Sequence, residues 1–115
     1  LQQKSAEMEA DAVMNRYHIG ILAYFLDKLA KTPEGDGTVL DQSLVLYGSG
    51  ISDGNQHDHG PLAILLAGGA RGRLEGNRHL VAAKGTPLAN LQLSLLHTLG
   101  VEAKSFADST GALGI

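Results

Sequence analysis

A short polar segment between two apolar runs holds most of the side chains in this chain that could bind a cation or move a proton. They are Asp53, Asn55, His57, Asp58 and His59. Carboxylate and imidazole groups are ligands that zinc, manganese and iron accept, and catalytic zinc sites use three protein ligands with one open position. We therefore predict that Asp53, His57 and His59 ligate a divalent metal, with Asn55 and Asp58 as substrate or supporting contacts.

The same segment has a simpler interpretation. Residues 52–55 can form an Asx-type turn, which would leave the two histidines solvated at the surface. The spacing matches no complete ligand signature of a recognised kind. A calcium loop of the EF-hand type is disfavoured, because the acidic spacing fails after Asn55 and no glutamate closes the loop. Spacing alone leaves both interpretations open.

A second segment with possible chemistry is residues 68–73, GGARGR. It lacks the spacing of a P-loop or a dinucleotide fingerprint, and no helix is expected directly behind it, so a glycine turn is favoured over a phosphate cradle. Arg78 and His79 follow and are further candidates for substrate or supporting contacts. Arginines on an irregular segment are, however, also typical of a solvated surface.

The first element that must support these residues is a long helix over residues 2–31. Apolar side chains recur there at helical spacing. They are Met14, Tyr17, Ile21, Leu22, Phe25 and Leu29. Thr32 and Pro33 should end the helix, because the residue before a proline is disfavoured in the α conformation.

Two apolar runs, residues 44–47 and 63–67, flank the polar segment and predict strands. Their continuous apolar character is typical of strands buried on both faces of a parallel sheet. Residues 79–82 could add a short strand. Thr86 as N-cap and Pro87 at the first helical position predict a leucine-rich helix that Gly100 closes.

The order helix, strand, strand, helix predicts an α/β fold with a small, mostly parallel sheet flanked by helices. The polar segment would then lie at the carboxyl ends of the strands, where ligands bind in open α/β sheets. A sheet of two or three strands would leave its edge strands exposed. We therefore expect residues 1–115 to be one fragment of a larger α/β domain. Within it, residues 1–32 form the long helix, 33–85 the strands and site loop, and 86–115 the capped helix and tail.

Composition excludes several classes of protein. The 115 residues include 9 Lys and Arg against 12 Asp and Glu, a net charge of -3 that argues against a nucleic-acid partner. No apolar run approaches the roughly 20 residues of a membrane span. The absence of cysteine excludes disulfides and thiolate metal sites. A start at Leu1, without methionine or signal peptide, indicates a processed product or an excerpt.

From about Tyr17 to its end, the chain resembles the C-terminal third of a bacterial secreted family, domain of unknown function 1552. The strings that carry the resemblance, in order, are TPEGDGTVLD, LVLYGSGISDGNQHDH, LLAGG, GRLEGNRHL, GTPLANLQLSLLHTLGV and FADSTGALGI. That family is similar to the alkaline phosphatase and sulfatase superfamily, where a strand ending in Ser-Asp and a His-bearing loop deliver metal ligands. The resemblance implies a partial alkaline-phosphatase-like three-layer sandwich, secretion or a periplasmic location, and Asp53 with His57 or His59 as ligands.

The resemblance further implies the C-terminal portion of a metal-dependent phosphatase- or sulfatase-like hydrolase. Such an enzyme would bind zinc, calcium, magnesium or manganese and act on a small anionic ester, with its nucleophile and first acidic ligands supplied by the remainder of the parent domain. The chain departs from the family at Ala63, where the family has a proline. The alternatives are a non-catalytic secreted binding or surface protein on the same fold, and a small α/β module that dimerises to cover its edges.

Overall fold

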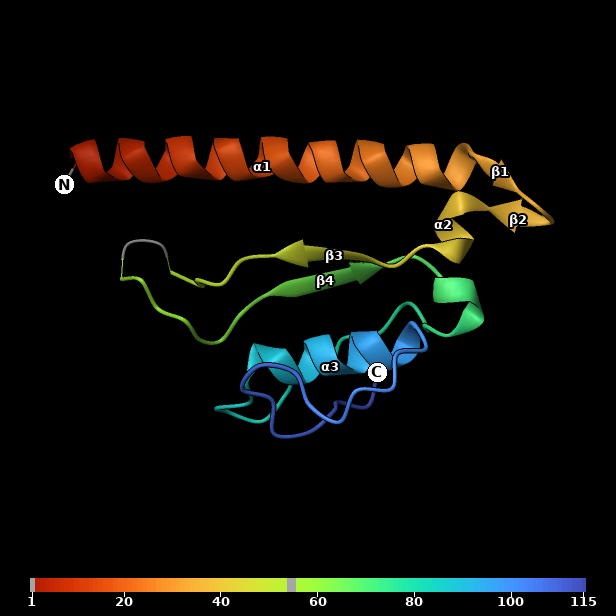
Figure 1. Cartoon of the computed structure of the whole chain (residues 1–115). Coiled ribbons are helices and arrows are strands. Elements are labelled where there is room, and N and C mark those ends of the chain that lie inside the picture. The colour runs from red at the N-terminus through yellow and green to blue at the C-terminus, as the bar shows by residue number, and fades with distance from the viewer. Residues whose placement is uncertain (1, 54–55) are drawn as a thin grey trace. The chain divides into compact units, whose positions relative to one another are not determined.

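The computed structural model describes residues 2–53 and 56–115, which form two compact units, Leu1–Val39 and Leu40–Ile115 (Figure 1). The first unit contains helix α1 (Gln2–Lys31) and the short strands β1 (Pro33–Glu34) and β2 (Gly37–Thr38). Helix α2 (Val39–Gln42) begins at the boundary. The second unit contains β3 (Val45–Gly48), β4 (Ile64–Ala67), the 3-10 turn η1 (Ala70–Gly72) and helix α3 (Leu88–Thr98).

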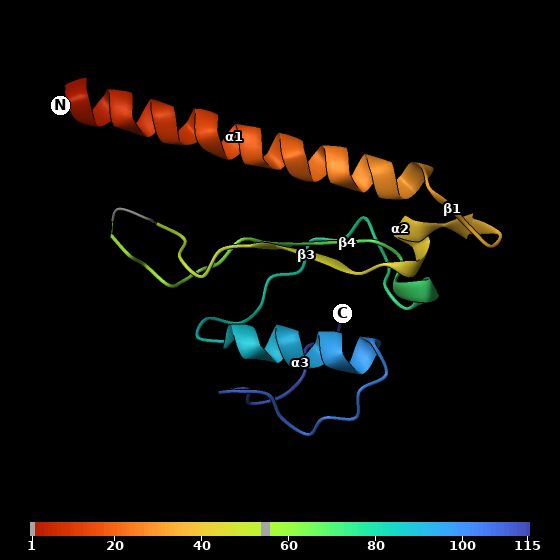
Figure 2. The same cartoon turned by 45° about the horizontal axis from the view of Figure 1, so that its top comes forward.

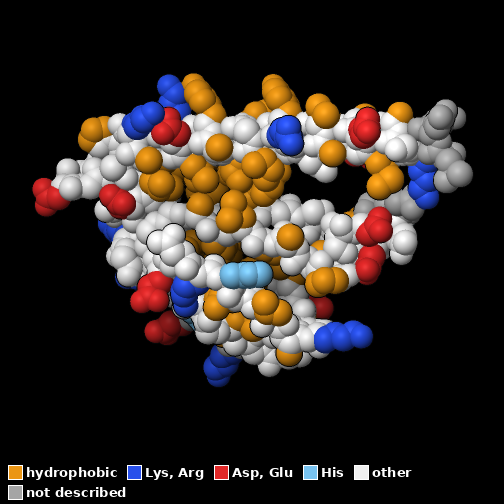
Figure 3. Space-filling model, turned by 180° about the vertical axis from the view of Figure 1, so that it is seen from behind, with side chains coloured by type: hydrophobic (Ala, Val, Ile, Leu, Met, Phe, Trp, Pro, Cys, Tyr) orange, Lys and Arg blue, Asp and Glu red, His pale blue; other side chains and the backbone are white. Residues whose placement is uncertain are grey.

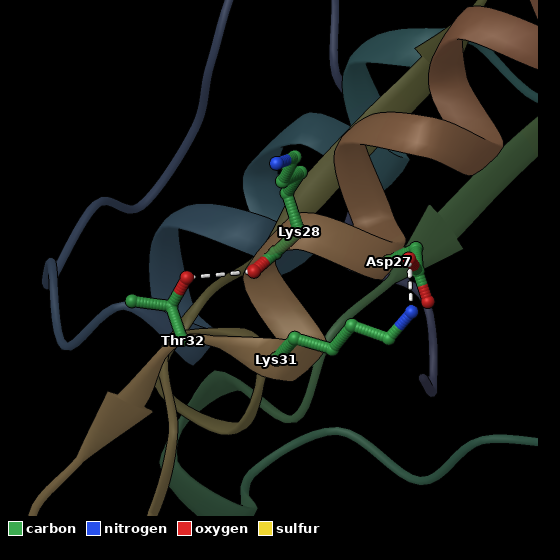
Figure 4. A network of polar contacts seen from close by, with 4 residues as sticks. All are labelled: Asp27, Lys28, Lys31 and Thr32. Atoms are coloured by element: carbon green, nitrogen blue, oxygen red, sulfur yellow. Dashed lines mark hydrogen bonds and ion pairs between the residues drawn. The ribbon is translucent and has the colours of Figure 1, made fainter.

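The long helix predicted over residues 2–31 is confirmed, and its end is built from local contacts (Figure 4). The Thr32 hydroxyl donates a hydrogen bond of 2.7 Å to the Lys28 carbonyl, which is one of the last carbonyls of α1. The Lys31 ammonium pairs with the Asp27 carboxylate at 2.7 Å. Lys28 and Lys31 also place positive charge at the negative end of the helix dipole. Pro33 then starts β1, which pairs with β2 as a tight antiparallel hairpin.

The predicted parallel sheet is wrong, because β3 and β4 pair antiparallel, with Val45 opposite Ala67 and Gly48 opposite Ile64. Figures 1 and 2 show the two strands running in opposite directions as one hairpin. The chain is therefore not an alkaline-phosphatase-like parallel-sheet sandwich. Parallel strands need a crossover connection, usually a helix. The connection between β3 and β4 instead folds back on itself, through an antiparallel bridge between Asp53 and Asp58.

The core of the second unit lies at α3, which contributes most of its buried residues. They are Ala89, Asn90, Leu93, Ser94 and Leu95. The helix begins one residue later than predicted, since Pro87 is its N-cap and the Thr86 hydroxyl donates to the Ala83 carbonyl. Gly100, at φ +85°, closes the other end in a Schellman motif. There the Gly100 N–H donates to the His97 carbonyl, and the Val101 N–H to the Leu96 carbonyl, each at 2.9 Å.

Two glycines connect β4 to the start of the second unit. The Gly69 N–H donates to the Leu40 carbonyl at 3.0 Å, and the Ala70 N–H donates to the Ser43 carbonyl at 2.9 Å. A side chain on Gly69 would meet the Asp41 carbonyl oxygen at 2.7 Å. This close approach of backbone to backbone is possible only without a Cβ atom.

Arg73 joins η1 to α3, because its Nη1 donates a hydrogen bond of 3.1 Å to the Thr98 carbonyl. The guanidinium thus satisfies a terminal carbonyl and complements the helix dipole. We expect Arg73→Ala to lower the free energy of unfolding by about 1 kcal/mol, measured by urea denaturation. Arg78→Ala is the matched control, since Arg78 bonds only locally, to Glu75. Equal effects of the two substitutions would show that the contact to α3 contributes nothing.

Candidate functional site

The tip of the β3–β4 hairpin, residues 49–60, holds the predicted ligands, and we refer to it as the 49–60 turn. Its described backbone closes through two hydrogen bonds, from the Ser52 N–H to the Asp58 carbonyl at 2.7 Å and from the Asp58 N–H to the Asp53 carbonyl at 3.2 Å. The candidate Asn55 lies outside the described residues. The turn connects the end of β3 to the start of β4, so it is a hairpin tip and not the carboxyl edge of a parallel sheet.

His59 is the candidate ligand with the best-defined orientation. Its Nδ1 lies 2.9 Å from the Gly50 carbonyl oxygen. A carbonyl oxygen can only accept, so Nδ1 carries a proton, and the lone pair of the neutral ring is then on Nε2. Metal-binding histidines typically donate their other ring N–H to a backbone carbonyl or carboxylate in this way. The side chain is exposed, so Nε2 is accessible from solvent.

The two aspartates are both tied to backbone groups of the turn. One carboxylate oxygen of Asp53 accepts the Gln56 N–H at 3.2 Å, and one of Asp58 accepts the Gly60 N–H at 3.1 Å. These contacts resemble those of the Asx-type turn that the sequence also allowed. A carboxylate offers about four acceptor sites, so one such bond orients Asp58 and still leaves it able to bind a cation.

The three predicted ligands do not form a cluster in the part of the chain that the structure describes. No group of three His, Asp or Glu side chains among those residues is placed to hold a metal ion. His57 has a left-handed backbone, at φ +52°, and an exposed side chain. The ligation of a metal by Asp53, His57 and His59 therefore stays a prediction. Hydrogen bonds orient the side chains of His59, Asp53 and Asp58.

The other candidates belong to different local structures. Arg78 contacts Glu75, by a hydrogen bond of 3.4 Å to its carbonyl and an ion pair of 3.8 Å to its carboxylate. His79 is exposed, and residues 79–82, all described, form no strand. In the glycine-rich segment, the N–H groups of Gly69 and Ala70 are bonded to carbonyls. These N–H groups therefore bind the backbone of residues 40–43 and are not presented to a phosphate.

Sequence reasoning missed the polar residues of α3. Asn90 and Ser94 are buried, and each bonds to the C-terminal tail. The signal that could have found them is their spacing, because two polar side chains four residues apart share one face of an otherwise leucine-rich helix.

No protein-family model, curated protein or solved structure matches the chain. Among the described residues, no helix is long and apolar enough to cross a membrane. The class of protein must therefore be inferred from the residues and contacts of the chain itself.

Proposed function

We propose that the 49–60 turn supplies part of a divalent-cation site, and that this site belongs to a larger metal-dependent hydrolase of small anionic esters. The observation that carries the proposal is the hydrogen bond between His59 Nδ1 and the Gly50 carbonyl. In the neutral ring this bond places the lone pair on Nε2 and orients the imidazole through a backbone group, as is typical of metal-binding histidines.

Exposed apolar surface supports the placement of this chain within a larger protein. Leu46 and Leu65, on opposite faces of the β3–β4 hairpin, are 44% and 47% exposed. A single two-stranded hairpin is marginally stable in water, so a hairpin apolar on both faces indicates additional covering layers. Apolar side chains also stand along α1 (Figure 3), among them Met14, Tyr17 and Phe25.

The donor set fits a site that is completed from elsewhere. Imidazole with carboxylate suits zinc and manganese, and the turn offers both within a few residues. Fewer than three ligands gather in the described part of the turn, so the proposal requires at least one ligand from the remainder of the larger protein. When bound, a divalent cation polarises a phosphoryl or sulfuryl oxygen. In this arrangement His59 would hold the cation together with a carboxylate of the turn, while the Gly50 carbonyl keeps the imidazole in position.

A non-catalytic binding protein is the second candidate, and Ser52 favours it. Its hydroxyl is directed at the carbonyl oxygens of Asp58 and Gly60, at 3.2 and 3.1 Å. A hydroxyl whose proton is directed at carbonyl oxygens is not donating that proton to a general base, as an activated nucleophile does. The hydrolase therefore needs a nucleophile from outside this turn, whereas cation binding alone does not.

Replacement of His59 tests the cation site directly. We expect the full-length protein to bind Zn²⁺ in calorimetric titration, and we expect His59→Ala to weaken that binding about tenfold or more, because a ligand is lost. His18→Ala is the matched control, since His18 is an exposed histidine on α1 in the first unit. Equal Zn²⁺ affinity of all three proteins would remove His59 from the site.

The reaction is tested on the full-length protein with aryl phosphates and aryl sulfates. The hydrolase proposal expects turnover that a chelator abolishes, that Zn²⁺ or Mn²⁺ restores, and that His59→Ala reduces more than His18→Ala does. Cation binding without turnover of either ester would favour the binding protein.

A further inference from the structure

Three polar side chains on α3 hold the C-terminal tail, residues 101–115, which runs back beside the helix (Figures 1 and 2). They are Asn90, Ser94 and His97, at the i, i+4 and i+7 positions of one helix face. His97 Nε2 donates to the Ala103 carbonyl at 2.6 Å. The tail has no helix or strand of its own, and its own backbone bonds are local ones, such as Ser109 to Phe106.

Asn90 and Ser94 each bind the tail through both a donor and an acceptor. The Asn90 side-chain carbonyl accepts the Thr110 N–H at 2.7 Å, and its amide donates to the Thr110 hydroxyl at 3.0 Å. The Ser94 hydroxyl accepts the Leu113 N–H at 2.6 Å, and its single proton is shared between the Leu113 carbonyl at 2.8 Å and the Asn90 carbonyl at 3.1 Å. This pairing imitates the contacts that a neighbouring strand makes with an extended backbone.

The two side chains are built into the helix core, since Asn90 is 6% and Ser94 4% exposed. Beside them on α3 lies Leu93, which is also buried. These exposed fractions apply with the tail in place, where the tail supplies hydrogen-bond partners to both side chains. An extended segment on this face therefore satisfies the polar groups that it covers.

The groups recognised in the tail are almost all backbone atoms. They are the N–H groups of residues 110 and 113 and the carbonyls of 103 and 113. We refer to Asn90, Ser94 and His97 together as the clamp, and the Thr110 hydroxyl is the tail side chain to which it hydrogen-bonds. The same groups exist in every copy of the chain. A tail from a second copy can therefore make the same set of bonds without any change in sequence.

One tight turn returns the tail to its own helix. Gly100 has φ +85°, a conformation that L-residues with a side chain adopt at a cost of roughly 1–2 kcal/mol. Because the connection is short, the tail of the same chain has a high effective concentration at the α3 face. It therefore binds in preference to the tail of a second copy, as long as the turn at Gly100 is unstrained. Exchange of an identical segment between copies becomes favoured when the connecting turn is strained.

We propose that the α3 face bearing Asn90 and Ser94 is a binding site for an extended peptide segment, filled by the tail of the same chain and able to take the tail of a second copy. The exchanged form is a symmetric dimer in which each α3 holds its partner's residues 101–115. This inference uses neither the 49–60 turn nor a metal, so it stands apart from the proposed function.

A strained hinge tests the exchange. We expect Gly100→Val to shift the full chain toward a dimer in sedimentation velocity at micromolar concentration, because a β-branched residue disfavours the left-handed turn. Gly111→Val is the matched control, since Gly111 has no neighbour within 4 Å of a built Cβ and no positive φ. It should leave the chain monomeric. A monomeric Gly100→Val chain with the Thr110 and Leu113 amides still protected from hydrogen exchange would overturn the proposal.

A second substitution shows whether the dimer uses this site. In the Gly100→Val background, Asn90→Ala should return most of the protein to the monomer, and circular dichroism should show that α3 is retained. Thr110→Pro should act in the same way, because proline removes the N–H that Asn90 accepts. A mixture of the two variants can form one complete clamp in a mixed dimer, so mixing should recover dimer. Dimers that persist in both variants would contradict exchange through the tail.

Discussion

Replacement of Gly68 by alanine is expected to lower the free energy of unfolding of the second unit by about 3 kcal/mol or more. Gly68 has φ +101°, which an alanine adopts only with strain. A Cβ there would also overlap the Ser43 carbonyl oxygen and come within 2.9 Å of its carbon. Both atoms belong to the backbone, so relief requires movement of the segment that Gly69 and Ala70 also bind. Urea unfolding followed by circular dichroism measures the effect.

Gly76→Ala is the matched control for this substitution. A Cβ on Gly76 would meet nothing within 4 Å, and its φ lies outside the left-handed range. Alanine at such a position usually stabilises by about 0.4–1 kcal/mol, because it restricts the unfolded chain. The two alanines should therefore shift the unfolding midpoint in opposite directions. A Gly68→Ala protein as stable as wild type would show that the contact of residues 68–70 with residues 40–43 is not formed in solution.

The helices could be predicted because their signals are local. Apolar spacing and Pro33 define α1 to within a residue, and the leucine pattern before Gly100 defines the end of α3. The start of α3 was misplaced by one residue, since Thr86 bonds to Ala83 and does not cap the helix. Helix boundaries are commonly misplaced by one or two residues, because the capping residue depends on side-chain geometry that cannot be read from the sequence.

Strand direction could not be predicted because it is not a local property. The run at 44–47 predicted a strand buried on both faces. A strand does form at Val45–Gly48, but the predicted burial is wrong, since its residues alternate between half-buried and exposed. Continuous apolar character favours parallel strands but does not require them. The direction is decided by the connection, and residues 52–58 close on themselves through Asp53 and Asp58. Because the strands are antiparallel, the candidate site lies at the tip of a hairpin and not at the carboxyl edge of a parallel sheet.

The types of residue in the candidate site were evident from sequence, but their roles were not. Spacing made Asp53, His57 and His59 equivalent candidates. The structure distinguishes them, because His59 is oriented by the Gly50 carbonyl nine positions earlier in the chain. A contact across the turn of this kind depends on the backbone path, including the left-handed conformation of His57. No periodicity in the sequence reports that path.

Leu93→Ala should be the most damaging substitution on α3, with a loss of about 2–5 kcal/mol in the free energy of unfolding. Leu93 is 2% exposed and is the largest fully buried side chain of the described residues. Removal of three side-chain carbons leaves a cavity that the surrounding helix and tail can fill only in part. Leu80→Ala is the matched control, because Leu80 is 55% exposed and its truncation should change stability by less than about 0.5 kcal/mol.

Leu93→Ala also tests whether the packing of α3 and its hydrogen bonds to the tail depend on each other. Leu93 precedes Ser94 directly, so a collapse around the cavity should displace the hydroxyl that binds Leu113. We expect hydrogen exchange at the Leu113 amide to accelerate in Leu93→Ala by more than the global loss of stability explains. Exchange at Leu113 that simply follows global unfolding would instead mean that α3 and the tail unfold as one cooperative unit. In that case the exchange of tails would proceed through complete unfolding, which would slow the approach of Gly100→Val to its monomer–dimer equilibrium without changing that equilibrium.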